Sequence, residues 1–208
     1  MDAADTIAAV EEATATERTR IGSDKALIAA TGANLEADAV WATAATREAG
    51  VAAALDGWAS DAADGDGALA SDDIVDAFDR AATAAGERAA RIDAAPAGPD
   101  ALSSHLDTVD GTAERVGAGL VAPALVFDRF YLQVVSFFVN EADEGSADTA
   151  RELRSWASDL GPARDALAAL DEAGRERAQE AAVEAVGVAY EEYASALESM
   201  GLDPKPVC

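Results

Sequence analysis

The sequence is poor in the residues that most metal and redox sites require. Its 208 residues include one cysteine, Cys208, and one histidine, His105. A single cysteine excludes an internal disulfide and a zinc site built from cysteine pairs, and it fits a reducing, cytoplasmic location. One histidine excludes the two Glu-x-x-His pairs with which helical bundles hold two iron ions. Any metal site in this chain would therefore depend on carboxylates.

Basic residues are also scarce. The chain has 15 lysines and arginines against 40 aspartates and glutamates, which gives a formal net charge of −25. Such a chain repels itself in low salt, and molar salt screens that repulsion. The composition resembles that of cytosolic proteins of extremely halophilic archaea. The absence of a basic patch argues against direct nucleic-acid binding, while a cationic partner stays an alternative explanation of the acidity.

Only one long apolar run is present. It reads AGLVAPALVFDRFYLQVVSFFVN, from Ala118 to Asn140, in a chain whose aromatic content is 5%. Asp128 and Arg129 lie near its middle, and each charge would cost about 3 kcal/mol or more at the centre of a bilayer. The run therefore predicts the central helix of a bundle over residues 123–140 and no membrane insertion.

The rest of the chain follows a helical pattern. Apolar residues recur at three- to four-residue steps, and proline- or glycine-containing acidic stretches separate the segments. No strand alternation, internal repeat or long linker is present. The sequence therefore predicts an all-α fold with residues 1–20 as an exposed arm or short helix, residues 21–200 as one helical domain, and residues 201–208 as an extended tail. Besides the central helix, helices are expected over residues 36–60, 71–93, 100–120, 147–170 with a break at 161–162, and 172–200.

Four stretches resemble a haloarchaeal protein family assigned to the rubrerythrin-like, ferritin-like group. They read GSDKALIAATGANLEADAV, TAERVGAGLV, QVVSFFVNEADEG and YEEYASALESMGLDPKPVC, and the resemblance covers residues 22–208. It implies a ferritin-like bundle with four long core helices and additional shorter ones. Some members of that family carry a transcription-antitermination label, which implies regulation through protein contacts as a weaker alternative.

The resemblance also points to candidate metal ligands. Glu48 occupies the place of a metal-bridging glutamate, Glu87 that of the glutamate of a Glu-x-x-His pair, and Glu184 and Glu191 offer further carboxylates. The histidine expected three residues after Glu87 is replaced by Ala90, so neither Glu-x-x-His pair is complete.

Two functions follow from these incomplete motifs. The leading hypothesis is a non-enzymatic interaction or structural module that binds no cofactor, in which Glu48 and Glu87 are solvated or paired with arginines such as Arg47 or Arg91. The alternative is an iron- or peroxide-handling oxidoreductase that holds iron or manganese with carboxylates alone.

The remaining residues leave other points open. A catalytic histidine needs a partner that orients its ring, and the sequence offers His105 only the nearby Asp107 and Asp110. We therefore predict no catalytic residue. The sequence predicts an unidentified protein partner, leaves a homodimer open, and assigns no role to Cys208.

Overall fold

The computed structural model describes residues 1–63 and 71–205. These residues are mostly helical and contain no strand, which confirms the predicted all-α class. The acidic, glycine-containing stretch over residues 61–73 was expected to be a loop, but it is helical up to Ala63 and again from Asp72; its residues 64–70, like Cys208, lie outside the described residues. In chain order the helices are α1 (Ala3–Ala13), α2 (Ala15–Ile21), α3 (Ala26–Thr31), α4 (Ala37–Ala63), α5 (Asp72–Arg91), α6 (Ala101–Leu106), α7 (Thr112–Arg115), the π-helix η1 (Val116–Val121), α8 (Ala122–Asn140), α9 (Glu144–Ala157), α10 (Gly161–Ala169) and α11 (Glu172–Ser199).

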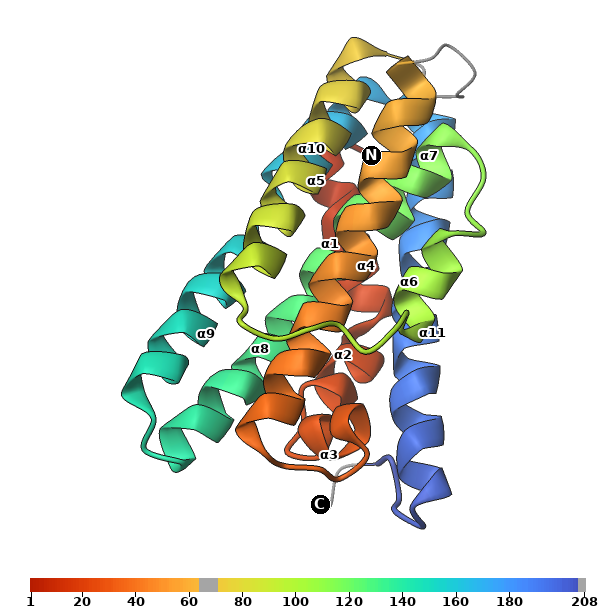
Figure 1. Cartoon of the computed structure of the whole chain (residues 1–208). Helices are drawn as coiled ribbons and strands as arrows, with labels where there is room; N and C mark the ends of the chain where they lie inside the picture. The colour runs from red at the N-terminus through yellow and green to blue at the C-terminus, as the bar shows by residue number, and fades with distance from the viewer. Residues whose placement is uncertain (64–70, 206–208) are drawn as a thin grey trace.

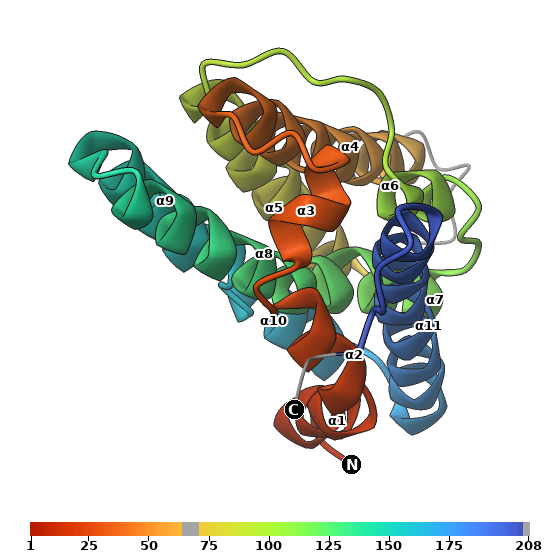
Figure 2. The ribbon, with the colours of Figure 1, turned by 90° about the horizontal axis from the view of Figure 1, so that it is seen from below.

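The long helices form the frame of the molecule. Helices α4 and α5 pack side by side, as do α8 and α9, while α11 runs beside α1, α2, α6, α7 and η1 (Figures 1 and 2). The apolar positions that predicted these helices form one cluster of buried residues. This cluster runs from Ile7 near the amino terminus to Leu197 near the carboxyl terminus, so one hydrophobic core holds both ends of the chain together.

The predicted central helix is confirmed as a core element. On α8 the side chains of Phe127, Phe130 and Phe138 are fully buried. By length and composition the segment Thr112–Asn140 is the one candidate membrane span among the described residues, but 61% of its most apolar window is buried inside the protein. The other helices therefore cover most of this apolar surface.

The predicted helix over residues 100–120 is divided into α6, α7 and η1. The chain turns at Gly111, whose φ of 90° is a conformation that glycine adopts readily. In η1, Gly117 lies against the backbone carbonyl of Ala178 on α11, and Gly119 lies against the ring of Trp58 on α4. The small residues of this stretch let three helices approach closely, and this close packing accompanies the π-helical turn.

The two ends of the chain are held more firmly than the sequence suggested. Residues 1–20 were expected to be exposed, but Ile7 and Val10 are buried and α1 packs against α10 and α11. At the other end, Lys25 Nζ donates hydrogen bonds to the carbonyls of Asp203 and Lys205, at 2.8 and 2.9 Å. Residues 202–205 are non-helical, as predicted, and lie beside the start of α3.

Candidate functional site

The structure does not bring the four candidate glutamates together. Glu48 on α4 is completely buried, whereas Glu87 on α5 and Glu184 and Glu191 on α11 are exposed. Among the described residues, no group of three or more histidine, cysteine, aspartate or glutamate side chains is arranged to hold a metal ion. Glu48 is therefore the one candidate that lies in the core.

Glu48 is bound by two other buried side chains. Arg88 Nε on α5 donates a hydrogen bond to Glu48 Oε2 at 2.8 Å, and the hydroxyl of Tyr131 on α8 donates to Oε1 at 2.9 Å. The expected partners Arg47 and Arg91 are directed elsewhere, and Arg91 pairs with an exposed carboxylate on α9. These contacts join three long helices through a single carboxylate, so they form an internal polar brace, here called the Glu48 triad.

Burial determines the electrostatics of the Glu48 triad. It raises the pKa of Glu48 above the usual range of a glutamate, and the guanidinium of Arg88 and the two hydrogen bonds oppose that shift. Burial together with the Glu48 carboxylate also raises the pKa of Tyr131 well above its usual value. Tyr131 therefore keeps its proton and acts as a hydrogen-bond donor, while both Glu48 oxygens are already occupied.

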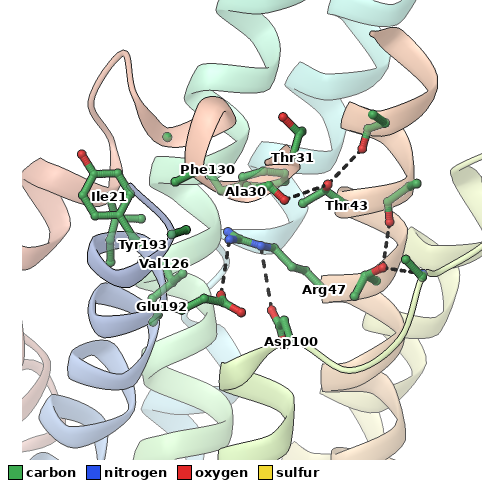
Figure 3. Close-up of a pocket in the computed structure, with 18 of the residues that line it drawn as sticks. Ile21, Ala30, Thr31, Thr43, Arg47, Asp100, Val126, Phe130, Glu192 and Tyr193 are labelled. Atoms are coloured by element: carbon green, nitrogen blue, oxygen red, sulfur yellow. Dashed lines mark hydrogen bonds and ion pairs between the residues drawn. The ribbon is translucent and has the colours of Figure 1, made fainter. Parts of the chain in front are cut away.

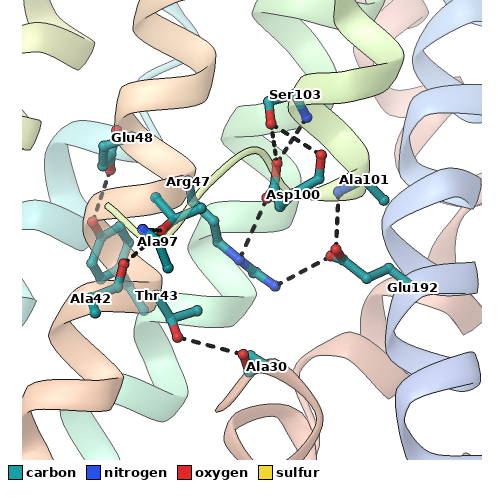
Figure 4. A network of polar contacts seen from close by, with 12 residues as sticks. Ala30, Ala42, Thr43, Arg47, Glu48, Ala97, Asp100, Ala101, Ser103 and Glu192 are labelled. Atoms are coloured by element: carbon teal, nitrogen blue, oxygen red, sulfur yellow. Dashed lines mark hydrogen bonds and ion pairs between the residues drawn. The ribbon is translucent and has the colours of Figure 1, made fainter. Parts of the chain in front are cut away.

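A cavity of about 550 Å³ lies on another side of α4 (Figure 3). It is bounded by α3, α4, α8, α11 and residues 97–100 of the connection between α5 and α6. Adjacent residues of α4 serve the two sites, because Arg47 reaches into the cavity while Glu48 points to a different side (Figure 4). The sequence placed both charges on one helix but did not indicate this division.

Arg47 contacts one aromatic ring and lies near two carboxylates without a hydrogen bond to either. Its guanidinium lies over the ring of Phe130, 4.3 Å from the ring centre. Its Nε atom is 3.8 Å from Asp100 Oδ2, and its Nη2 atom is 4.0 Å from Glu192 Oε2. Both distances exceed those of a hydrogen bond. Arg47 therefore interacts with the two carboxylates through charge alone.

The two carboxylates are fixed by the amino-terminal end of α6. Asp100 caps this helix by accepting a hydrogen bond from the backbone N–H of Ser103 at 2.8 Å, through Oδ1. Glu192 on α11 accepts one from the backbone N–H of Ala101 at 2.9 Å, through Oε1. Asp100 Oδ2 and Glu192 Oε2 accept no hydrogen bond from any residue that the structure describes. Each carboxylate is therefore held in place by one oxygen and offers the other to the cavity.

His105 lies apart from both sites. It is in the last turn of α6 and half-buried, and its imidazole has no hydrogen bond or ion pair within residues 1–63 and 71–205. Its backbone carbonyl accepts a hydrogen bond from the Thr108 hydroxyl at 2.7 Å. A catalytic histidine needs a group that orients the ring, and the described part of the chain provides none at this position.

Sequence reasoning missed most of the groups that form these two sites. Arg88, Tyr131, Asp100 and the cavity contacts of Arg47 were not identified as a set. One signal was present, because two adjacent charged residues interrupt the apolar pattern of the helix predicted over 36–60. A charge at an inward position requires a partner, but the pattern does not identify it.

Comparison with known proteins adds no assignment. No family model matches the chain, and no curated protein or solved structure matches it significantly. The functional argument therefore depends on the Glu48 triad and the cavity.

Proposed function

We propose that this chain is a non-enzymatic, halophilic helical bundle of the ferritin-like type that acts in the cytosol as an interaction or structural module. The proposal depends on one observation: the buried carboxylate of Glu48, the candidate metal ligand, is paired with an arginine. Arg88 and Tyr131 bind both oxygens of Glu48, at 2.8 and 2.9 Å. Under this proposal the Arg88–Glu48 ion pair replaces a bound metal ion.

Physical chemistry supports this substitution. A buried carboxylate is strongly destabilising unless a cation and hydrogen-bond donors compensate it. In a di-iron bundle the metal ions supply that positive charge, and here the guanidinium of Arg88 supplies it. The other three candidate glutamates are exposed and do not reach this place. A redox reaction through metal at Glu48 would first require the Arg88 contact to break.

The arrangement of helices is compatible with the ferritin-like part of the proposal. Four helices, α4, α5, α8 and α11, are long, and α4 and α5 form an antiparallel pair. The Glu48 triad joins three of them, α4, α5 and α8, as core ligands do in helical bundles. Two shorter helices, α3 and α6, each pack against both α4 and α11 (Figure 1).

Metal content tests the proposal. In protein purified from molar salt without chelators, we expect iron, manganese and zinc each far below one equivalent per chain by elemental analysis. Glu48→Gln should leave the measured content unchanged, and so should the exposed control Glu87→Gln. Stoichiometric iron or manganese that persists through desalting and is lost in Glu48→Gln would refute a metal-free core.

Salt dependence tests the halophilic part. With a net charge of −25, transfer from about 2 M to about 0.1 M KCl should lower the helical circular dichroism signal and the melting temperature, because the Debye length grows to about 10 Å. Sucrose added at low salt is the control, since it stabilises compact states without screening charge. Melting curves that coincide at both salt concentrations would contradict this explanation of the acidity.

A further inference from the structure

The cavity beside Arg47 has the size and lining of a small-molecule site. Its volume of about 550 Å³ lies within the range of about 300–1,000 Å³ that is typical of such sites. Alanines from α3, α4 and α11 form much of the wall, and the ring of Phe130 forms part of it. Small side chains on these facing helices leave the space open and make most of its surface apolar. We call this space the Arg47 cavity.

The charged side chains that line the Arg47 cavity are gathered in one place. Figure 3 shows Arg47, Asp100 and Glu192 pointing toward one another at the wall. Asp100 and Glu192 each present one oxygen that accepts no hydrogen bond from the described residues. The Arg47 guanidinium stays 3.8 and 4.0 Å from these oxygens. Two charged acceptors are therefore available to a donor that enters the cavity.

The sign of the local charge selects the ligand. One guanidinium and two carboxylates leave the cluster with an excess of one negative charge. An anionic ligand would meet two repulsive groups for each attractive one. A cation placed between Asp100 and Glu192 would instead attract both carboxylates, and each carboxylate would then lie between two positive charges, the ligand and Arg47. Charge complementarity therefore favours a cation.

The environment of the cluster selects the kind of cation. An ammonium group donates several hydrogen bonds, and charge-assisted bonds to carboxylates are the strong ones. An inorganic ion would satisfy the carboxylates but would leave the apolar walls unfilled. An apolar body attached to the ammonium would be removed from water against the alanines of the wall.

We propose that the Arg47 cavity binds an organic ammonium ion with an apolar body. Its N–H groups donate to Asp100 Oδ2 and Glu192 Oε2, and its body fills the space between α3, α4 and α11. Arg47 keeps its place over Phe130 and holds the two carboxylates on one side of the cavity. This site is separate from the Glu48 triad, so it does not depend on whether the core is free of metal.

Three probes of equal length test the charge preference. We would titrate n-hexylamine, n-hexanol and n-hexanoate into the full-length protein by isothermal titration calorimetry, in molar KCl at pH 7, where the amine is protonated. The amine is expected to bind with a stoichiometry of one, about tenfold or more tightly than the alcohol and the carboxylate. The high concentration of potassium makes this a direct competition with an inorganic cation.

Two variants locate the binding site. Glu192→Gln removes one charge but keeps an amide oxygen that can accept the Ala101 N–H, so we expect about tenfold weaker amine binding and unchanged alcohol binding. The matched control is Glu191→Gln, an exposed neighbour on the same helix, which should change neither. Ala42→Leu places a larger side chain in the cavity wall and should weaken binding of both amine and alcohol.

Several outcomes would overturn the proposal. These are an affinity for hexanoate equal to or above that for hexylamine, no measurable amine binding, equal behaviour of Glu192→Gln and Glu191→Gln, and amine binding unaffected by Ala42→Leu. Circular dichroism of each variant in molar salt establishes that it is folded before its affinity is compared.

Discussion

Arg88→Met is expected to lower the free energy of unfolding by about 3–5 kcal/mol at neutral pH, because it leaves Glu48 buried without its counter-charge. Glu48 is completely buried and Arg88 is 7% exposed, so water does not replace the lost partner. Urea denaturation in molar KCl, followed by circular dichroism, measures the change without altering ionic strength.

Two comparisons identify the cause of that loss. Arg91→Met removes the exposed pair with Glu152, whose side chains are 53% and 52% exposed, and should cost about 1 kcal/mol or less. Adding Glu48→Gln to Arg88→Met removes the uncompensated charge and should recover part of the stability. Equal effects of Arg88→Met and Arg91→Met would contradict the structural role assigned to the Glu48 triad.

The pH dependence of Arg88→Met has a definite sign. Burial raises the pKa of Glu48 in the folded protein, so the folded state holds this proton to a higher pH than the unfolded state does. The stability linked to this group is fully present below the ordinary pKa of a glutamate and is lost as pH rises through the raised value. The guanidinium of Arg88 opposes the rise in the pKa of Glu48. Removing Arg88 therefore raises this pKa further and increases the stability that is lost at high pH.

The stability deficit of Arg88→Met relative to the wild type should therefore shrink on acidification, when Glu48 becomes protonated. Comparing the two proteins at about pH 8 and about pH 5 in molar KCl tests this, because the wild type corrects for the other carboxylates. A deficit that stays constant or grows as pH falls would show that Glu48 is not the group responsible.

Gly117→Ala is the second substitution with a large expected effect, a loss of about 3 kcal/mol or more in the free energy of unfolding. The added methyl group would overlap the backbone carbonyl of Ala178, which cannot rotate away as a side chain can. Relief requires η1 and α11 to separate, and that separation would disturb the packing along both helices. Urea denaturation measures the loss.

A second glycine provides the matched control. Gly187 lies in α11, and a methyl group built on it meets no atom within 4 Å. Gly187→Ala should therefore raise the free energy of unfolding by up to about 1 kcal/mol, since alanine is the better helix former. If Gly117→Ala were as well tolerated as Gly187→Ala, the close approach of η1 to α11 would not be a constraint on the fold.

The long helices were predicted well because the spacing of apolar residues within each helix is enough to identify it. Apolar spacing over a few turns placed α4, α5, α8 and α11, and the break before α10 was anticipated from a glycine-proline pair. The expectation of one helix over residues 100–120 was wrong, because the turn at Gly111 divides that segment. The expected exposure of residues 1–20 also differs from the structure, since short apolar segments become buried only when a distant helix covers them.

The candidate sites were predicted less well than the helices. Glu48 was singled out as a candidate metal ligand, and the partners expected for it were arginines close to the candidate glutamates in the sequence. The actual partners, Arg88 and Tyr131, are 40 and 83 residues away in the sequence. The apolar pattern of a helix indicates which of its residues face the core. It does not indicate which side chain of another helix will lie opposite them.

By itself, the sequence determined the all-α class, the limits of the long helices, the apolar character of α8 and the excess of negative charge. These properties follow from composition and from periodicity over a few residues. Only the tertiary structure decided that Glu48 is bound by an arginine and a tyrosine, and that Arg47 shares a cavity with Asp100 and Glu192. Such pairings depend on how helices distant in the sequence pack, because a buried charge is stabilised by whatever group the fold places within a few ångströms.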